Sequence, residues 1–151
     1  MGREQTILSE RMVKPGGFMI FNPGFTIIEV VYASAIADDE AMIRYALKSI
    51  IKSLNMVCVG EATNGLEAVA LYAKEKPDIM FLDINMPVKN GDEALKDICA
   101  KFPDANVVML TSVAETETVK KCVQDGAINY ILKTNPLDKI KLMVEEIVKN
   151  I

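Results

Sequence analysis

The stretch "IMFLDINMPVKNGDEAL", residues 79–95, decides the fold, because it takes the chain from a buried strand into a helix. Its first four residues, 79–82, are all apolar, which is typical of a strand covered on both faces of its sheet. A single carboxylate, Asp83, follows directly, and a proline and a glycine then break the apolar run. Apolar residues next recur at helical spacing, at Leu95, Ile98 and Phe102. The stretch therefore predicts a strand that ends in a carboxylate, then a loop and a helix.

The same alternation of short apolar runs and amphipathic stretches continues along the chain. The runs are Val30–Ala37, Met56–Val59, Ile79–Leu82, Val107–Leu110 and Ile128–Leu132. The helical patterns cover residues 43–54, 66–74, 95–102, 116–124 and 140–151. Five strand–helix repeats predict an α/β fold, a doubly wound five-stranded parallel sheet with right-handed crossovers and helices on both faces.

Composition limits the classes of function. The chain has 151 residues, half of them apolar, which is enough for one core. Its net charge of −4, without a cluster of Lys and Arg, argues against a nucleic-acid surface, so we expect a protein or a small ion as partner. Histidine is absent, which excludes a Ser-His or Cys-His nucleophile pair and argues against zinc. The cysteines, Cys58, Cys99 and Cys122, are odd in number and lie among apolar residues, which predicts buried thiols and a cytoplasmic location.

Polar side chains follow four of the predicted strands, where parallel strands of an open α/β sheet gather their reacting groups. They are Asp38 and Asp39, Asp83, Thr111 and Ser112, and Lys133. Three carboxylates at one edge repel each other unless a cation joins them, which predicts a Mg²⁺ site with oxygen ligands. A lysine and a hydroxyl on the same edge suit an incoming phosphoryl group.

Five segments of the chain together resemble one family. In order, they are "IADDE", "FLDINMP", "NGDEAL", "VVMLTS" and "GAINYILK". The set is similar to the receiver domain of bacterial response regulators, of the chemotaxis CheY-like kind, over residues 28–151. The resemblance implies a flavodoxin-like sheet with strand order 2-1-3-4-5, preceded by an extension of unknown structure at residues 1–27.

The resemblance also implies a role for each site residue. Asp83 would be the phosphoacceptor, Thr111 would bond a phosphoryl oxygen, and Lys133 would pair with the phosphorylated aspartate. Tyr130 would be the aromatic residue that turns inward on activation. The Mg²⁺ ligands would be Asp38, Asp39, Asp83 and, through its backbone carbonyl, Asn85.

The function implied is that of a two-component signalling switch in the cytoplasm. Its phosphoryl group would come from a phosphohistidine of a sensor histidine kinase or a phosphotransfer protein, and phosphorylation would change binding to a downstream protein or to a second copy. Neither nucleic acid nor membrane is an expected partner, and the only catalysis would be self-phosphorylation and self-dephosphorylation. A pseudo-receiver without phosphoryl transfer is the alternative. A hydrolase of the phosphoaspartate type would want a second aspartate where Asn85 stands.

Each site residue also has a structural alternative. Asp38 can cap the helix that starts near Glu40, and Thr111 or Ser112 can cap the later one. Lys133 alone would be a surface lysine, and Tyr130 an ordinary amphipathic core residue. The sequence "LKTNPLDK" departs from the family, where proline directly follows the lysine, so we expect a trans peptide after Lys133.

The segment before the resemblance holds two apolar runs, "FMIF" and "FTIIEVV", around the turn-forming "NPG". Two alternatives stay open for it. It forms a hairpin or an arm that packs on a neighbour, or it is an extension with little structure.

Overall fold

The computed structural model describes residues 13–14, 17–21, 28–113 and 117–151, with side chains described from Val31 onward. Within these ranges the larger sheet has five parallel strands in the order β5-β4-β6-β7-β8. These strands are β4 (Ala33–Ala37), β5 (Val57–Ala62), β6 (Ile79–Asp83), β7 (Val107–Thr111) and β8 (Asn129–Leu132). Numbered within this sheet, the order is 2-1-3-4-5, which confirms the predicted doubly wound α/β fold.

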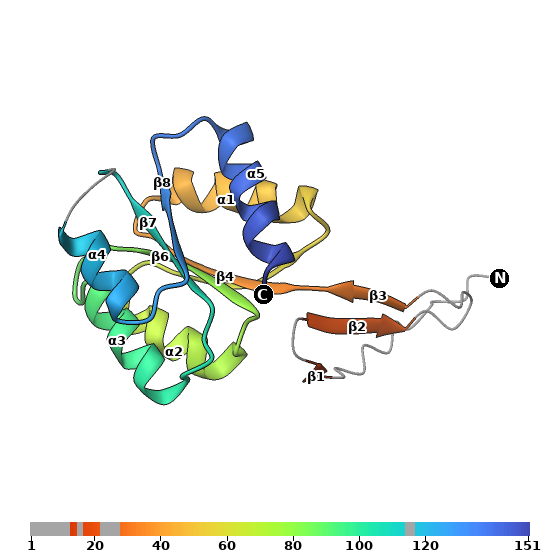
Figure 1. Cartoon of the computed structure of the whole chain (residues 1–151), viewed down its shortest axis with the longest axis horizontal. Coiled ribbons are helices and arrows are strands. Elements are labelled where there is room, and N and C mark those ends of the chain that lie inside the picture. The colour runs from red at the N-terminus through yellow and green to blue at the C-terminus, as the bar shows by residue number, and fades with distance from the viewer. Residues whose placement is uncertain (1–12, 15–16, 22–27, 114–116) are drawn as a thin grey trace.

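Helices cover both faces of this sheet (Figure 1). The helices on one face are α1 (Ala41–Ser53) and α5 (Leu137–Lys149). Those on the other face are α2 (Gly65–Glu75), α3 (Gly91–Lys101) and α4 (Glu117–Gln124). The start predicted for the fourth helix, Thr116, lies outside the described residues. No helix within the described ranges combines the length and apolar character that a bilayer span requires.

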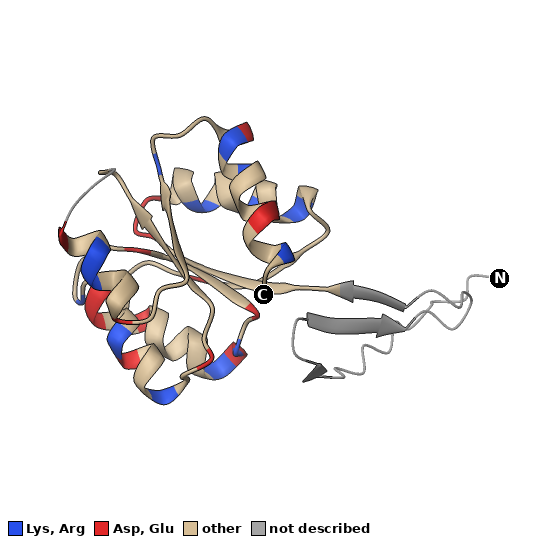
Figure 2. Ribbon diagram, viewed as in Figure 1, with Lys and Arg blue, Asp and Glu red and all other residues tan. Residues whose placement is uncertain are grey.

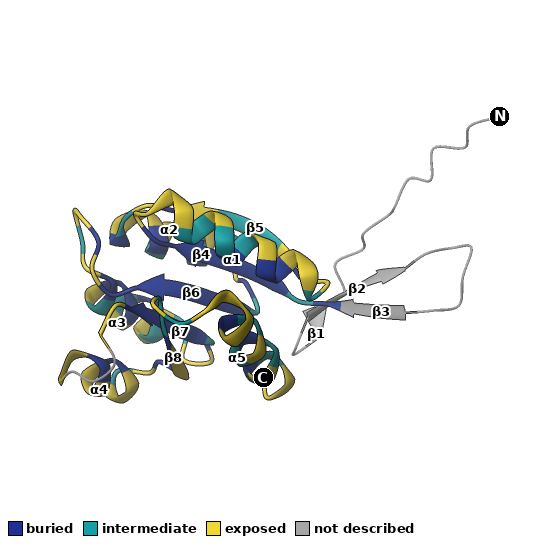
Figure 3. Ribbon diagram, turned by 90° about the horizontal axis from the view of Figure 1, so that it is seen from above, coloured by how far each residue is buried: buried dark blue, intermediate teal, exposed yellow. Residues whose placement is uncertain are grey.

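The core divides into two layers because side chains alternate along each strand. On β6, Ile79 and Phe81 pack with α1 and α5, whereas Met80 and Leu82 pack with α2 and α3. Each of the strands β4, β6 and β7 has five residues, all of them buried. Figure 3 shows these strands between the helices of the two faces. The middle of the sheet is therefore covered on both faces, and packing on both sides positions its strand ends.

The run Val30–Ala37 is not one strand, and that prediction was wrong. The structure divides it at Tyr32 into β3 (Ile28–Val31) and β4, because the two halves pair with different partners. β3 pairs antiparallel with β2 (Gly17–Phe21), which in turn pairs with β1 (Val13–Lys14). β4 lies between β5 and β6, where its alanines at 33, 35 and 37 are buried.

Two further sequence expectations need correction. The apolar runs at residues 56–59 and 128–132 are typical of strands covered on both faces, but β5 and β8 are edge strands that carry exposed or half-exposed residues. Cys122 is buried, whereas Cys58 and Cys99 are only half-buried. All three thiols are free, as predicted.

The antiparallel pairing of β2 with β3 is that of a hairpin, one of the two alternatives for the N-terminal segment. The "NPG" turn that would connect the two strands lies outside the described residues. Because β3 pairs with β2 and β4 begins only at Ala33, residues 28–31 belong to the smaller sheet. The division into an extension, 1–27, and a receiver domain, 28–151, stays a prediction.

Candidate functional site

Three carboxylates meet at the carboxyl ends of two neighbouring strands. Asp83 is the last residue of β6, and Asp38 and Asp39 directly follow β4. One carboxylate oxygen from each residue lies within 4.8 Å of the others. In Figure 2, the red segment between β4 and α1 and the red end of β6 mark this acidic cluster. The predicted convergence of the three aspartates is present in the structure.

Lys133 closes the cluster from the end of β8, on the other side of β7. Its backbone N–H donates to the Thr111 carbonyl at 2.8 Å, which places the side chain over the strand ends. Its Nζ lies 2.8 Å from Asp38 Oδ2 and 3.2 Å from Asp83 Oδ2. With a side chain only 7% exposed, Lys133 is not the surface lysine of the structural alternative.

The charges in the cluster are only partly balanced. Burial, and then the charge of Asp38, raise the pKa of Asp83 to about 6, although Lys133 acts against this shift. Burial also raises the pKa of Asp38. For Lys133, burial acts to lower the pKa, but hydrogen bonds to Asp38 and Glu40 and the charges of Asp38 and Asp83 outweigh it, so the pKa is raised. One lysine therefore does not fully offset two buried carboxylates.

The donor set fits a hard divalent cation. Asp38 Oδ2 is buried and, within the described residues, its contact is the ion pair with Lys133 rather than a well-directed hydrogen bond. Mg²⁺ binds oxygen ligands at about 2.1 Å, so two of its ligands lie up to about 4.2 Å apart. The three carboxylate oxygens are near that spacing already. Asp38, Asp39 and Asp83 are thus the residues that would hold Mg²⁺.

The loop after β6 fixes the carboxylate of Asp83. The backbone N–H of Asn85 donates to Asp83 Oδ1 at 3.3 Å. Gly91 passes so close that a Cβ there would lie 1.7 Å from the Asp83 carbonyl oxygen, and its N–H donates to the Ile84 carbonyl at 2.7 Å. Only glycine fits this approach. The role of the Asn85 carbonyl as a metal ligand stays a prediction.

Thr111 lies on β7, next to the strand of Asp83, and Tyr130 lies on the edge strand β8. Thr111 ends β7, is buried, and exchanges hydrogen bonds between its hydroxyl and the Val113 backbone at 3.1 and 3.2 Å. The hydroxyl is therefore one strand away from Asp83 and held in a local turn. Tyr130, on β8, is 36% exposed, so it is not a core residue in this structure. Its inward turn, and the bond from Thr111 to a phosphoryl oxygen, remain predictions.

The capping alternative for Asp38 is correct in part. Its Oδ1 accepts the backbone N–H of Glu40 at 2.8 Å, next to the start of α1, while its Oδ2 faces Lys133. Both oxygens of this buried carboxylate are thus assigned, one to the helix start and one to the cluster. The peptide after Lys133 is trans as expected, since the described residues contain no cis peptide bond.

Sequence analysis missed two residues around the cluster. Glu40 Oε1 lies 3.0 Å from Lys133 Nζ, and Arg44 Nη1 donates to the Asp38 carbonyl at 2.8 Å. The only sequence signal for Glu40 was its position directly after the acidic pair. Because its partner lies 93 positions away along the chain, no local pattern could reveal the contact.

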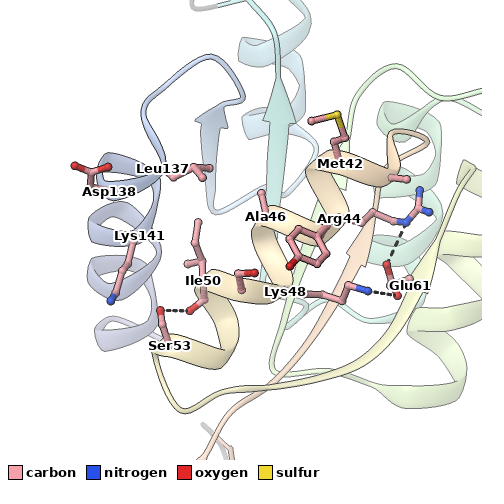
Figure 4. A pocket seen from close by; sticks show the side chains of 13 residues that line it. Met42, Arg44, Ala46, Lys48, Ile50, Ser53, Glu61, Leu137, Asp138 and Lys141 are labelled. Carbon is pink, nitrogen blue, oxygen red and sulfur yellow. Dashed lines mark hydrogen bonds and ion pairs between the residues drawn. The ribbon is translucent and has the colours of Figure 1, made fainter.

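A groove runs beside the cluster, between α1 and α5 (Figure 4). It has a volume of about 840 Å³ and is open to solvent. Exposed apolar side chains lie along it: Met42, Tyr45 and Leu137. The groove therefore offers an apolar surface next to the acidic cluster, and none of the three aspartates lines it.

Comparison with known proteins gives consistent matches. The family model for the response regulator receiver domain matches residues 35–145. The chemotaxis protein CheY of Listeria monocytogenes is 40% identical over 114 residues, which cover 76% of this chain and 96% of that protein.

Solved structures agree with the sequence matches. The response regulator domain of Thermotoga maritima CheB has a TM-score of 0.73 and 32% identity, covering 80% of this chain and 95% of that one. A CheX–CheY–BeF3–Mg²⁺ complex from Borrelia burgdorferi has a TM-score of 0.73 and 29% identity, covering 77% of this chain and 88% of that one.

Proposed function

Because the chain belongs to the response regulator receiver family, we propose that it accepts a phosphoryl group on Asp83 with Mg²⁺ and so switches its binding to a protein partner. Receiver domains are signalling switches that bind Mg²⁺ in an acidic pocket. The observation that carries the proposal is the convergence of Asp38, Asp39 and Asp83 on one cation-binding point next to Lys133.

In the proposed reaction, a carboxylate oxygen of Asp83 attacks the phosphorus of a phosphohistidine. The new O–P bond forms as the P–N bond breaks, and the histidine nitrogen leaves and takes a proton. Mg²⁺, when bound, offsets negative charge on the transferred group. Lys133 supplies a positive charge close to Asp83, and the Asn85 N–H orients the second oxygen. Hydrolysis of the acyl phosphate returns the switch to its first state.

A phosphohistidine donor would lie outside these 151 residues, because they include no histidine. A sensor histidine kinase or a phosphotransfer protein would present its phosphohistidine to Asp83. The apolar side chains of Met42, Tyr45 and Leu137 beside the cluster give such a donor a surface to pack on. Charge favours a protein over nucleic acid, given the net charge of −4.

The phosphorylated state would signal through the strands next to Asp83. A phosphoryl group adds negative charge that Thr111 and Lys133 can both engage. Thr111 would leave its turn with Val113, and Tyr130 would then swing inward from its exposed position. The surface around α4, β8 and α5 would change as a result, and a downstream protein or a second copy would bind there.

The two alternatives have less support. A pseudo-receiver without phosphoryl transfer does not need three convergent aspartates and a buried lysine, yet all four are present. A phosphoaspartate hydrolase would want an acid two residues after Asp83, where Asn85 stands.

Intact mass measurement after incubation with Mg²⁺ and a small phosphoryl donor tests the proposal. We expect the addition of one phosphoryl group to the parent protein and none to Asp83→Asn. Asp78→Asn, a matched change at the opposite end of β6, should label like the parent. Labelling of Asp83→Asn, or no labelling of the parent, would contradict the proposal.

A further inference from the structure

Glu40 contacts Lys133 inside the cluster, and the proposed function gives it no role. It is the N-cap residue of α1, but its side chain makes no capping hydrogen bond. Glutamate is also not a preferred N-cap residue. Instead, Oε1 lies 3.0 Å from Lys133 Nζ, and the side chain of Glu40 is 59% exposed. The position therefore serves the contact with Lys133.

The contact with Glu40 is a hydrogen bond from Lys133 Nζ at 3.0 Å, and ion pairs with Asp38 and Asp83 surround the same ammonium group. An ammonium group has three N–H donors, and the three carboxylates of Asp38, Glu40 and Asp83 lie within 3.2 Å of Nζ. Asp38 also accepts the Glu40 backbone N–H at 2.8 Å, so Asp38, Glu40 and Lys133 form a closed ring of contacts. A new acceptor on Asp83 therefore competes for Lys133 with the carboxylates that surround it.

Of the two partners that remain carboxylates after phosphorylation, Glu40 is more easily displaced than Asp38. Asp38 has no exposed surface, so leaving Lys133 would strand its buried charge, whereas the exposed carboxylate of Glu40 regains water on release. A phosphoryl group carries up to two negative charges, against one on Glu40, and offers three acceptor oxygens.

We infer that Glu40 is a positioning residue that holds Lys133 in the unphosphorylated protein and competes with the phosphoryl group for it. The inference rests on the proposed function and adds to it a built-in bias towards the resting state. The negative charge of Glu40 also partly neutralises Lys133, so Lys133 repels a cation at the aspartates less strongly. Removal of Glu40 should therefore weaken Mg²⁺ binding, because Lys133 then opposes the cation more strongly, and strengthen binding of the phosphoryl group.

The two affinities should change in opposite directions, which distinguishes this role from a merely structural one. In Glu40→Gln, which removes the charge and keeps the shape, we expect Mg²⁺ affinity to fall roughly two- to fivefold. At saturating Mg²⁺, affinity for beryllium fluoride, a mimic of the phosphoryl group, should rise by a similar factor. Calorimetric titration measures the first quantity and NMR titration the second. Damage to the fold would lower both affinities, and thermal unfolding would reveal it.

Glu145→Gln is the matched control, since it removes the same charge from an exposed pair with Lys149 at 4.0 Å on α5. It should change neither affinity. Glu40→Asp keeps the charge but shortens the reach to Lys133, so it should also bind the mimic more tightly. If the mimic binds the parent but Glu40→Gln fails to tighten it, the inference is wrong and the proposed function stands. If the parent binds no mimic, both are wrong.

Discussion

At the amino ends of the strands, the carboxylate of Asp78 accepts the backbone N–H of Ala33 at 2.7 Å, whereas at the carboxyl ends Asp38 and Asp83 share one lysine. The Asp78 backbone carbonyl also accepts the side-chain amide of Asn106 at 3.1 Å, which ties three strand ends together. At that end, a fixed donor of the fold satisfies the carboxylate.

The difference separates a structural carboxylate from a reactive one. The hydrogen bond from Ala33 forms when β4 and β6 come together, so it stabilises their pairing. At the opposite end, burial and the neighbouring Asp38 disfavour ionised Asp83. The carboxylate at one end of the sheet thus stabilises the fold. The carboxylates at the other end repel each other, and a bound cation can reduce that repulsion.

Removal of the shared lysine should have the largest effect on stability. Lys133→Met leaves the buried carboxylates without a cation, so we expect the free energy of unfolding to fall by about 3 kcal/mol. Urea unfolding without metal measures this loss, and Mg²⁺ should recover part of it. Lys149→Met removes an exposed lysine instead and should change little. Equal losses of unfolding free energy in the two variants would mean that Lys133 does not offset repulsion between the buried carboxylates.

Exchange of the carboxylates for amides compares the two ends of the sheet directly. Asp83→Asn removes an unfavourable charge, so it should stabilise the metal-free protein at pH 7 by about 2 to 3 kcal/mol. Asp78→Asn weakens the bond from Ala33 and should destabilise. Urea unfolding of both variants measures the two changes in stability. Changes of the same sign would contradict the proposed difference between the two ends of the sheet.

The pH dependence of the first effect follows from the raised pKa. A carboxyl with a folded pKa of about 6 and an unfolded pKa near 3.8 binds more protons in the folded state between these values. Stability of the parent relative to Asp83→Asn should therefore increase as the pH falls from about 6 towards 4. The difference in unfolding free energy between the parent and Asp83→Asn should disappear at low pH. If this difference stays constant from pH 7 to pH 4, the charge of Asp83 is not its cause.

Mg²⁺ should stabilise the parent by a smaller amount. At a concentration tenfold above its Kd, a ligand specific for the folded state adds about 1.4 kcal/mol. Asp39→Ala should remove this gain, because Asp39 supplies one of the three convergent oxygens. Thermal unfolding with and without Mg²⁺ measures the shift. If the parent protein does not respond to Mg²⁺, the hydrogen bond that the Glu40 N–H donates to Asp38 Oδ1 remains as the explanation for an aspartate at position 38.

Local patterns predicted most strands of the central sheet and the position of the aspartates at strand ends, because these features depend on residues next to them. Asp83 follows a buried run, so its position at a strand end could be deduced from residues 79–82. Pairing partners were harder: the continuous run Val30–Ala37 serves two sheets, and nothing within it marks Tyr32 as the division. The contact between Glu40 and Lys133 depends on the order of the strands and on side-chain reach, so it needed the structure.

The smallest expected effect concerns the path away from the acidic end. Thr111 is the hydroxyl on the strand next to Asp83, and its bonds to Val113 have to break before it can reach a phosphoryl group. Thr111→Ala should therefore keep phosphoryl labelling but lose the response of the α4, β8 and α5 surface, a change of about 1 kcal/mol for one hydrogen bond. Hydrogen exchange with and without beryllium fluoride measures the response. Ser112→Ala, an exposed hydroxyl one residue later, is the control and should respond as the parent does. Changes confined to α1 and α2 in the parent, or a full response in Thr111→Ala, would show that the signal leaves Asp83 by another route.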